Sequence, residues 1–234
     1  VLKNLFWTVV QDFRLRVVRK YKKNKIIVLP QSVHYNNSAL MQRHMEEFNQ
    51  HHLLYICVRD TTSFENLKKF FDSGRLLLVP DMALYLEGIT TTQKNNKSNR
   101  STLYIRRTDR EFSGSIIVPT EVETKDWPSF KIKSPSIYMF RLLLRISREL
   151  HLRGSALADK TLDFYYEQVM KKFLIQTGVN FISQYDTIIT SRLHGMILAY
   201  LLGKQVYFTD NSTGKLSAFY NTWLRDCDKI RKYN

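Results

Sequence analysis

An arginine and a histidine separate two apolar runs in the segment TIITSRLHGMILAYLLG, residues 187–203. The first run, 187–190, is predicted to be a buried strand, and a helix is predicted from about residue 195. The first turn of a helix presents free backbone N–H groups and the positive end of the helix dipole, which together bind anions. Arg192 can add two hydrogen bonds to a phosphate or a carboxylate, and His194 can exchange a proton near neutral pH. The junction therefore predicts an anion site with a proton-transfer group beside it, although a lone histidine is more often an ordinary hydrogen-bonded residue.

Polar residues also follow the other apolar runs of the chain. Because ligands of open parallel sheets bind beyond the carboxyl ends of the strands, these residues are expected on one rim. The candidates for binding a substrate there are Gln31, Ser32, His34, Asp81, Arg107, Asp109, Glu111, Ser191, Gly195, Asp210, Asn211 and Lys215. Arg107 would supply a second anion contact, while Asp109 and Glu111 would either orient it or bind sugar hydroxyls. Each candidate also has a plainer interpretation, as a solvated strand end or a helix cap.

The elements that position these residues alternate between strand and helix. Short apolar runs predict strands at 25–30, 53–58, 75–80, 102–106, 187–190 and 205–208. Helical periodicity predicts helices at 5–21, 37–51, 62–71, 136–153, 160–177 and 195–202, with residues 113–135 irregular. Asn37 or Ser38 is expected to cap the second helix, a Thr62-x-x-Glu65 capping box is expected to open the third, and Gly178 suits a helix end. This alternation predicts an α/β fold with parallel sheets.

A polar stretch divides the chain into two predicted lobes. Residues 88–101 contain almost no apolar side chains, which is typical of a linker or a long loop. The predicted domains are therefore an α/β lobe over residues 1–90 and a second α/β lobe over residues 91–234.

The chain is strongly basic, with 36 lysine and arginine residues against 21 aspartate and glutamate residues and a formal charge of +15. This balance favours anionic partners, although it is also typical of a solvated basic surface. The predicted helix at 136–153 carries Arg141, Arg145, Arg148 and Arg153 between apolar residues. It is expected either to rest on anionic lipid or to pack with an exposed basic face.

The cysteine content and the hydropathy indicate a cytoplasmic protein without a membrane span. Cys57 and Cys227 provide neither a disulfide framework nor a zinc set, which suits a reducing compartment. No apolar run approaches the roughly 20 residues that cross a bilayer. Neither a metal nor a cofactor is expected.

Five segments together resemble the polysaccharide pyruvyl transferase family. They read IIVLPQSVHY, VRDTTSFE, VPDMAL, YIRRTDRE and IITSRLHGMILAYLLGKQVYFTDNSTGKLSAFYNTWL, and they follow the family's order over roughly residues 5–224. The resemblance implies two facing Rossmann-like lobes of the GT-B type, with the acceptor on the N-terminal lobe and the donor on the C-terminal lobe. It also implies transfer of pyruvate from phosphoenolpyruvate to two hydroxyls of a sugar, with ketal formation and release of phosphate. The implied products are bacterial exopolysaccharides, capsules or cell-wall glycans, made from sugar or lipid-linked oligosaccharide acceptors.

The resemblance also assigns residues. Arg192 and His194 fall on the family's donor-binding and catalytic turn, where Leu193 would contribute a backbone contact, and Arg107 falls on a second donor-binding arginine. Two departures stand out. The family's Gly-rich first strand is absent from this sequence, which starts at or after that point, and Thr213 stands where an aromatic residue is common.

Other functions fit parts of the pattern. A GT-B glycosyltransferase that uses a nucleotide sugar would share the lobes and the anion site. A basic module that binds nucleic acid would suit the charge, but the basic residues are spread along the chain and form no recognised motif. A non-catalytic family member could act as a scaffold. Lipid-linked acceptors would place the protein peripherally on the inner face of the membrane.

Overall fold

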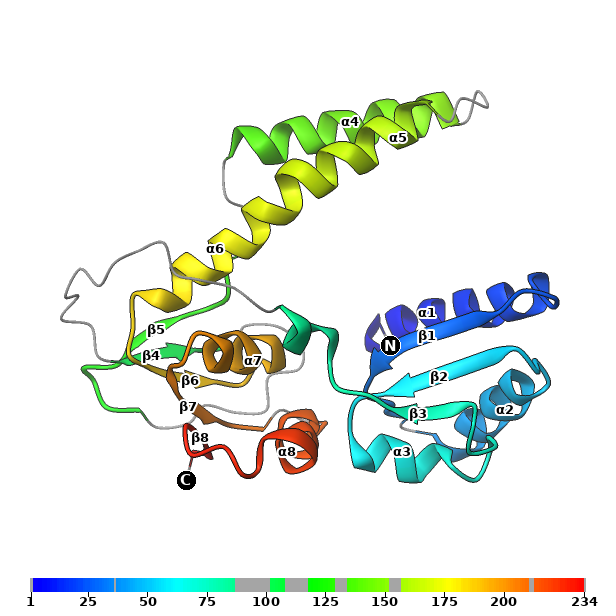
Figure 1. Ribbon diagram of the computed structural model, residues 1–234, viewed down its shortest axis with the longest axis horizontal. Helices are drawn as coiled ribbons and strands as arrows, with labels where there is room; N and C mark the ends of the chain where they lie inside the picture. The colour runs from blue at the N-terminus through cyan, green and yellow to red at the C-terminus, as the bar shows by residue number, and fades with distance from the viewer. Residues whose placement is uncertain are drawn as a thin grey trace.

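Two parallel β-sheets organise the part of the chain that the structure describes (Figure 1). The computed structural model describes residues 2–35, 37–86, 102–107, 118–128, 134–151, 157–210 and 213–233. The first sheet has three strands in the order β1-β2-β3, and the second has five in the order β5-β4-β6-β7-β8. Neighbouring strands run parallel in both sheets. The prediction of an α/β fold with parallel sheets is confirmed.

The N-terminal lobe alternates helix and strand. Its elements are α1 (Leu2–Lys20), β1 (Ile26–Gln31), α2 (Ser38–Asn49), β2 (Leu54–Val58), α3 (Thr61–Leu67) and β3 (Leu76–Leu78). One face of the sheet is buried, because Leu54 and Ile56 of β2 pack in one cluster with apolar side chains of all three helices. On the opposite face Ile27 and Leu29 of β1 are exposed.

Side-chain caps fix where α2 and α3 begin. The Asn37 side chain accepts a hydrogen bond from the backbone N of Leu40 at 2.9 Å, so Asn37 caps α2 as predicted. The predicted capping box at the start of α3 is wrong, because the N-cap lies two residues before Thr62. Asp60 caps this helix by accepting from the backbone N of Ser63 at 2.7 Å, and a carboxylate suits the positive end of the helix dipole.

The C-terminal lobe builds its core around the central strands of the second sheet. Its strands are β4 (Thr102–Ile105), β5 (Glu123–Lys125), β6 (Thr187–Thr190), β7 (Gln205–Phe208) and β8 (Ile230–Lys232). Its helices include α6 (Lys171–Ser183), α7 (Leu193–Leu201), α8 (Lys215–Phe219) and the π-helical turn η3 (Tyr220–Leu224). Leu103, Ile188 and Val206 are fully buried against Met196 and Ile197 of α7. Strands β5 and β8 were not predicted, because their sequences, ETK and IRK, are mostly polar and form no apolar run.

The helix predicted to end at Gly178 continues beyond it. α5 (Leu157–Tyr165), the π-helical segment η2 (Tyr166–Met170) and α6 follow one another without a break to Ser183. A Cβ atom at Gly178 would lie 3.1 Å from Cδ2 of Leu198 and 3.3 Å from Cζ2 of Trp127. This glycine therefore allows α6 to approach α7 and Trp127 closely and does not end the helix.

α4 (Pro135–His151) and α5 form a hairpin that projects from the C-terminal lobe at the top of Figure 1. We call residues 135–151 and 157–170 the helical arm. The Tyr165 hydroxyl donates a hydrogen bond to the carbonyl of Ser136 at 3.1 Å near the base of the arm. Ser147 donates to Asp159, and Nδ1 of His151 lies 3.0 Å from the other carboxylate oxygen near the tip. No helix among the described residues is both long and apolar enough to cross a membrane.

The two lobes touch through the ends of their strands and helices. Nε1 of Trp223 donates to the carbonyl of Arg59 at 2.8 Å, and the backbone N of Thr61 donates to the Thr222 hydroxyl at 3.1 Å. The short 3-10 helix η1 (Met82–Tyr85), which follows β3, packs Ala83 and Leu84 against the core of the C-terminal lobe. The predicted boundary near residue 90 falls outside the described residues and stays a prediction.

Candidate functional site

The connection from β6 to α7 is held by Thr190, a fully buried residue at the end of the strand. Its Oγ1 accepts a hydrogen bond from the backbone N of Arg192 at 3.0 Å. A Cβ atom at Gly195 would lie 3.1 Å from the same Oγ1, so the absence of a side chain there brings the first turn of α7 close to β6. Arg192 occupies the N-cap position of α7 without a side-chain hydrogen bond to the helix backbone. The predicted strand-to-helix turn is present, and its helix starts at Leu193.

His194 faces a carboxylate from the other lobe. Its Nε2 lies 3.6 Å from Oδ2 of Asp81, which is too long for a direct hydrogen bond but close enough for a strong electrostatic contact. The His194 side chain is 69% exposed, whereas the Asp81 side chain is 7% exposed. Residues 113 positions apart in the sequence thus meet where the lobes adjoin. Two of the predicted site residues are therefore neighbours in space.

Asp81 is surrounded by donors. Its Oδ1 accepts from the backbone N of Ala83 at 3.0 Å, and its Oδ2 accepts from Nη1 of Arg59 at 2.5 Å. Burial alone would raise the pKa of Asp81, but His194, the Ala83 N–H and Arg59 together hold this pKa well below its usual range. Asp81 is therefore ionised at neutral pH and presents a fixed negative charge to His194.

Arg59 connects three structural units and was not among the predicted site residues. Its Nε donates to the Ser32 hydroxyl at 3.0 Å, its Nη1 binds Asp81, and its carbonyl accepts from Trp223. The guanidinium and the backbone carbonyl of Arg59 thus join the ends of β1, β2 and β3 to the C-terminal lobe. Arg59 directly follows the apolar run 53–58, which is the same signal that selected the other candidates.

Arg192 forms an ion pair with Asp126, which, like Arg59, was not among the predicted site residues. Nε and Nη2 of Arg192 lie 2.9 Å and 2.6 Å from Oδ1 of Asp126, which follows β5 directly. Both side chains are about three-quarters buried, with exposures of 22% and 26%. Asp126 lies in the region that was predicted to be irregular. Its carboxylate fixes the guanidinium beside the turn that leads into α7.

The register between β4 and β6 places Arg107 near the same edge of the second sheet as Arg192. Ile105 of β4 pairs with Thr190 of β6, so Arg107 and Arg192 each follow a paired position by two residues. The carboxyl ends of adjacent parallel strands share one edge, which brings these two arginines to one side of the sheet. Asp109, Glu111 and Asn211 lie outside the residues that the structure describes.

The remaining candidates of the N-terminal lobe follow β1. Nη2 of Arg14, on α1, donates to Oε1 of Gln31 at 2.5 Å, while Ser32 receives Arg59. Burial lowers the pKa of Arg14, and burial raises the pKa of the nearby Tyr35 to about 12 despite the opposing charge of Arg14. His34 lies in the loop after β1. Arg14, which the sequence did not single out, thus places a cation beside Gln31.

Asp210 supports the backbone near the end of β7. Its Oδ1 accepts from the backbone N atoms of Leu216 and Ser217 at 3.1 Å and 3.3 Å, so it caps the start of α8. Gly214 precedes α8 with a φ of +66°, a left-handed conformation that favours glycine. Lys215 is the first residue of α8. Asp210 thus has a structural role at the start of α8.

Comparison with known proteins decides the family. The model of the family described as polysaccharide pyruvyl transferase matches residues 2–213. The chain belongs to the polysaccharide pyruvyl transferase family. The resemblance inferred from the five sequence segments is confirmed.

Two relatives show how much of a pyruvyl transferase the chain represents. It is 30% identical over 221 residues to EpsO of Bacillus subtilis, a protein whose name assigns it provisionally to the pyruvyl transferases. It is 24% identical over 219 residues to Pyruvyl transferase 1 of Schizosaccharomyces pombe. The matches cover 94% and 93% of this chain but only 66% and 51% of those relatives. The chain therefore spans between half and two thirds of their length.

A solved structure shares the fold. The chain superposes on a functionally uncharacterised protein of Klebsiella pneumoniae with a TM-score of 0.53, over 90% of this chain and 64% of that one. At 19% identity this similarity concerns the fold alone.

Proposed function

We propose that the chain carries the donor site of a phosphoenolpyruvate-dependent pyruvyl transferase. The acceptor would be a sugar or a lipid-linked oligosaccharide in the synthesis of a bacterial exopolysaccharide, capsule or cell-wall glycan. Membership of the family supports this reaction class. The observation that carries the proposal is the start of α7, where an uncapped helix N-terminus, the Arg192 guanidinium and His194 occur together.

This turn suits the charge of the proposed donor. Phosphoenolpyruvate has a phosphate and a carboxylate, so it needs two anion contacts. The first turn of α7 would bind one of them through its backbone N–H groups, including that of Leu193, with Ser191 and Gly195 shaping the turn. Arg192 and Arg107 would bind the other and stabilise negative charge on the leaving phosphate. We further propose that the lobes correspond to the facing lobes of GT-B enzymes, with Gln31, Ser32 and His34 on the acceptor side.

The reaction balances without a cofactor. A proton is added to the methylene carbon C3 of phosphoenolpyruvate, and one sugar hydroxyl oxygen bonds to C2. The bond between C2 and the phosphate oxygen then breaks, and the second hydroxyl oxygen bonds to C2 to close the ketal. The two hydroxyl protons are balanced by the proton gained at C3 and the proton retained by inorganic phosphate. His194 would transfer one of these protons.

Asp81 would orient His194 in this scheme and would not exchange protons itself. Its pKa is held well below the usual range, so it is a weak base near neutral pH. Its charge, 3.6 Å from Nε2, favours the tautomer that carries the N–H on that side of the ring. The scheme needs a second group that transfers a proton, and we propose Asp109 or Glu111 for it, the two carboxylates that follow Arg107 in the sequence.

Ligand choice tests the donor assignment. We expect phosphoenolpyruvate to bind in a calorimetric titration, and Arg192→Lys to weaken that binding by about tenfold, because lysine cannot make two parallel hydrogen bonds to an anion. Arg16→Lys is the matched control, since Arg16 is exposed on α1. Binding of UDP- or GDP-sugars in place of phosphoenolpyruvate would favour a glycosyltransferase. Equal binding by Arg192→Lys and wild type would remove Arg192 from the donor site.

A further inference from the structure

Part of the exposed surface of the helical arm is apolar, although it takes no part in packing α4 against α5. On α4, Tyr138, Leu142 and Ile146 are exposed at 57%, 49% and 42%. These residues recur every four positions, so they form one stripe along the helix, which Met139 widens. An exposed apolar stripe on a projecting element indicates a surface that contacts something else.

The contacts within the arm lie on other faces of its helices. Tyr165 bonds to the backbone of Ser136, Phe140 packs against Tyr166 with ring centroids 5.9 Å apart, and Ser147 and His151 bind Asp159. None of these contacts between α4 and the rest of the arm therefore involves the stripe. α5 adds Leu157 and Phe164, exposed at 73% and 69% and seven residues apart on one side of that helix.

A basic stripe runs beside the apolar stripe of α4. Arg141, Arg145 and Arg148 are exposed and lie three to four residues apart, so they occupy one adjoining side of the helix. α4 carries one acidic residue, Glu149, against these three arginines. On α5 and η2 one basic residue, Lys160, stands against three acidic residues, Asp159, Asp163 and Glu167. The excess of positive charge on the arm is thus on α4, next to the apolar stripe of that helix.

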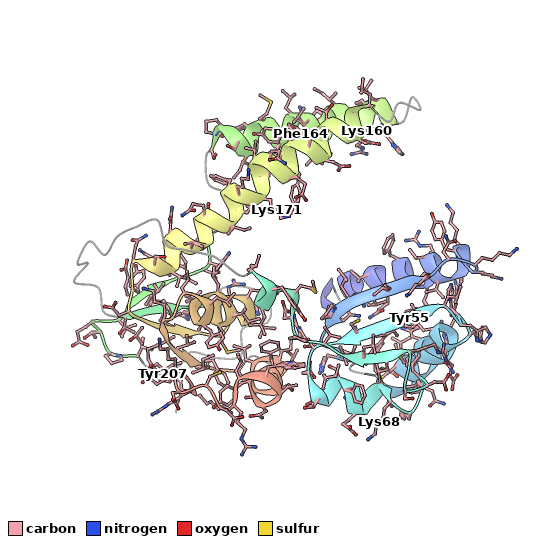
Figure 2. All side chains as sticks on the ribbon, viewed as in Figure 1. Tyr55, Lys68, Lys160, Phe164, Lys171 and Tyr207 are labelled. Atoms are coloured by element: carbon pink, nitrogen blue, oxygen red, sulfur yellow. The ribbon has the colours of Figure 1, made fainter. Side chains whose placement is uncertain are left out.

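Apolar side chains flanked by arginines match an anionic lipid surface. On binding to such a surface, the apolar stripe would insert at the boundary between the headgroups and the acyl chains, and the arginines would contact the anionic headgroups. In Figure 1 the arm projects upward from the C-terminal lobe and extends to the right above the N-terminal lobe. Figure 2 marks Lys160 and Phe164 on α5 and Lys171 at the start of α6. A second copy fits less well, because a two-fold contact through the stripe would place like-charged arginines along one seam.

We propose that the helical arm docks the protein reversibly onto anionic lipid bilayers through the apolar stripe and the adjoining arginines of α4. This inference rests on the arm alone and does not depend on the proposed pyruvyl transfer. The stripe covers about two helical turns, so binding is expected to be weak and to fall as salt rises.

Vesicle co-sedimentation tests the proposal. The chain should sediment with vesicles of equimolar phosphatidylglycerol and phosphatidylcholine at low salt, and remain in solution with vesicles of phosphatidylcholine alone. Combined Arg141→Gln, Arg145→Gln and Arg148→Gln should weaken binding by roughly a hundredfold, since each basic residue near an anionic surface contributes about a fivefold factor. The matched control removes the same charge elsewhere, with Lys22→Gln, Lys23→Gln and Lys25→Gln in the exposed turn before β1.

A second pair of variants tests the apolar contribution. Leu142→Ser with Ile146→Ser should weaken vesicle binding by about tenfold or more. Leu29→Ser, at a leucine of β1 that is more exposed than either, should leave it unchanged. Unchanged melting temperatures will show that the variants are folded. Equal binding to both vesicle types, an equal loss with the lysine variant, or no vesicle binding would overturn the proposal. So would dimers in solution that the Leu142→Ser and Ile146→Ser variant abolishes while vesicle binding persists.

Discussion

Replacement of His194 by alanine is expected to lower turnover of phosphoenolpyruvate by about 10²- to 10⁴-fold. A positioned acid or base contributes a factor of this size, and His194 stands at the first turn of the helix that would bind the donor. The exposure of the His194 side chain means that its removal should cost little stability. The measurement is the rate of phosphate release at saturating donor, with wild type and variant compared at equal concentration.

The control for this experiment is another exposed histidine. His52→Ala, in the turn between α2 and β2, should release phosphate at the wild-type rate. A His194→Ala variant that keeps more than about a tenth of wild-type turnover would remove the proton-transfer role, because such a loss is smaller than acid–base catalysis provides.

The second large effect is expected at Asp81 and concerns stability. Asp81→Asn leaves an acceptor for the backbone N of Ala83 but removes the charge that pairs with Arg59, whose side chain is only 14% exposed. Removing one partner of a buried ion pair leaves an uncompensated charge and costs about 3 kcal/mol. In a chain of this length the melting temperature should fall by about 6–12 °C. Glu65→Gln is the control, because its ion pair with Lys68 is more than half exposed and should contribute little.

The effect of Asp81 should depend on pH with a defined sign. The pKa of Asp81 is lower in the folded chain than in the unfolded chain, so its contribution to stability is complete above the unfolded pKa, near 4, and is lost as the pH falls through the folded value. The difference in melting temperature between wild type and Asp81→Asn should therefore be constant near neutral pH and shrink below about pH 4. A difference that grows with acidification would contradict the assignment of Asp81 as the ionised partner of Arg59 and His194.

The sequence predicted the local parts of this molecule well. The turn from β6 to α7 could be predicted because a strand, a polar junction and a helix follow one another within a few residues. Asn37 was a recognisable cap for the same reason. The Asp60 cap was missed because Thr62 and Glu65 form a competing pattern two residues later. β5 and β8 were missed because their short sequences are mostly polar, unlike the apolar run of β3.

The partners across the site could not be predicted, because they depend on how segments that are far apart in the sequence pack together. Arg192 binds Asp126, 66 residues away in the sequence, and His194 faces Asp81 on the other lobe. Arg59 carries the same sequence signal as Asp81, but only the structure shows that one guanidinium reaches both Ser32 and Asp81. Gly178 has the residue type of a helix end, yet its environment of Leu198 and Trp127 shows that it serves close packing.

The most direct test of the account is release of phosphate from phosphoenolpyruvate in the presence of sugar acceptors. The acceptors would be galactosides, mannosides, glucosides and N-acetylhexosaminides, each assayed with wild type and with His194→Ala. The account predicts release that requires one class of acceptor and is lost in the variant. Release that is independent of any acceptor, or no release together with binding of a nucleotide sugar, would contradict it.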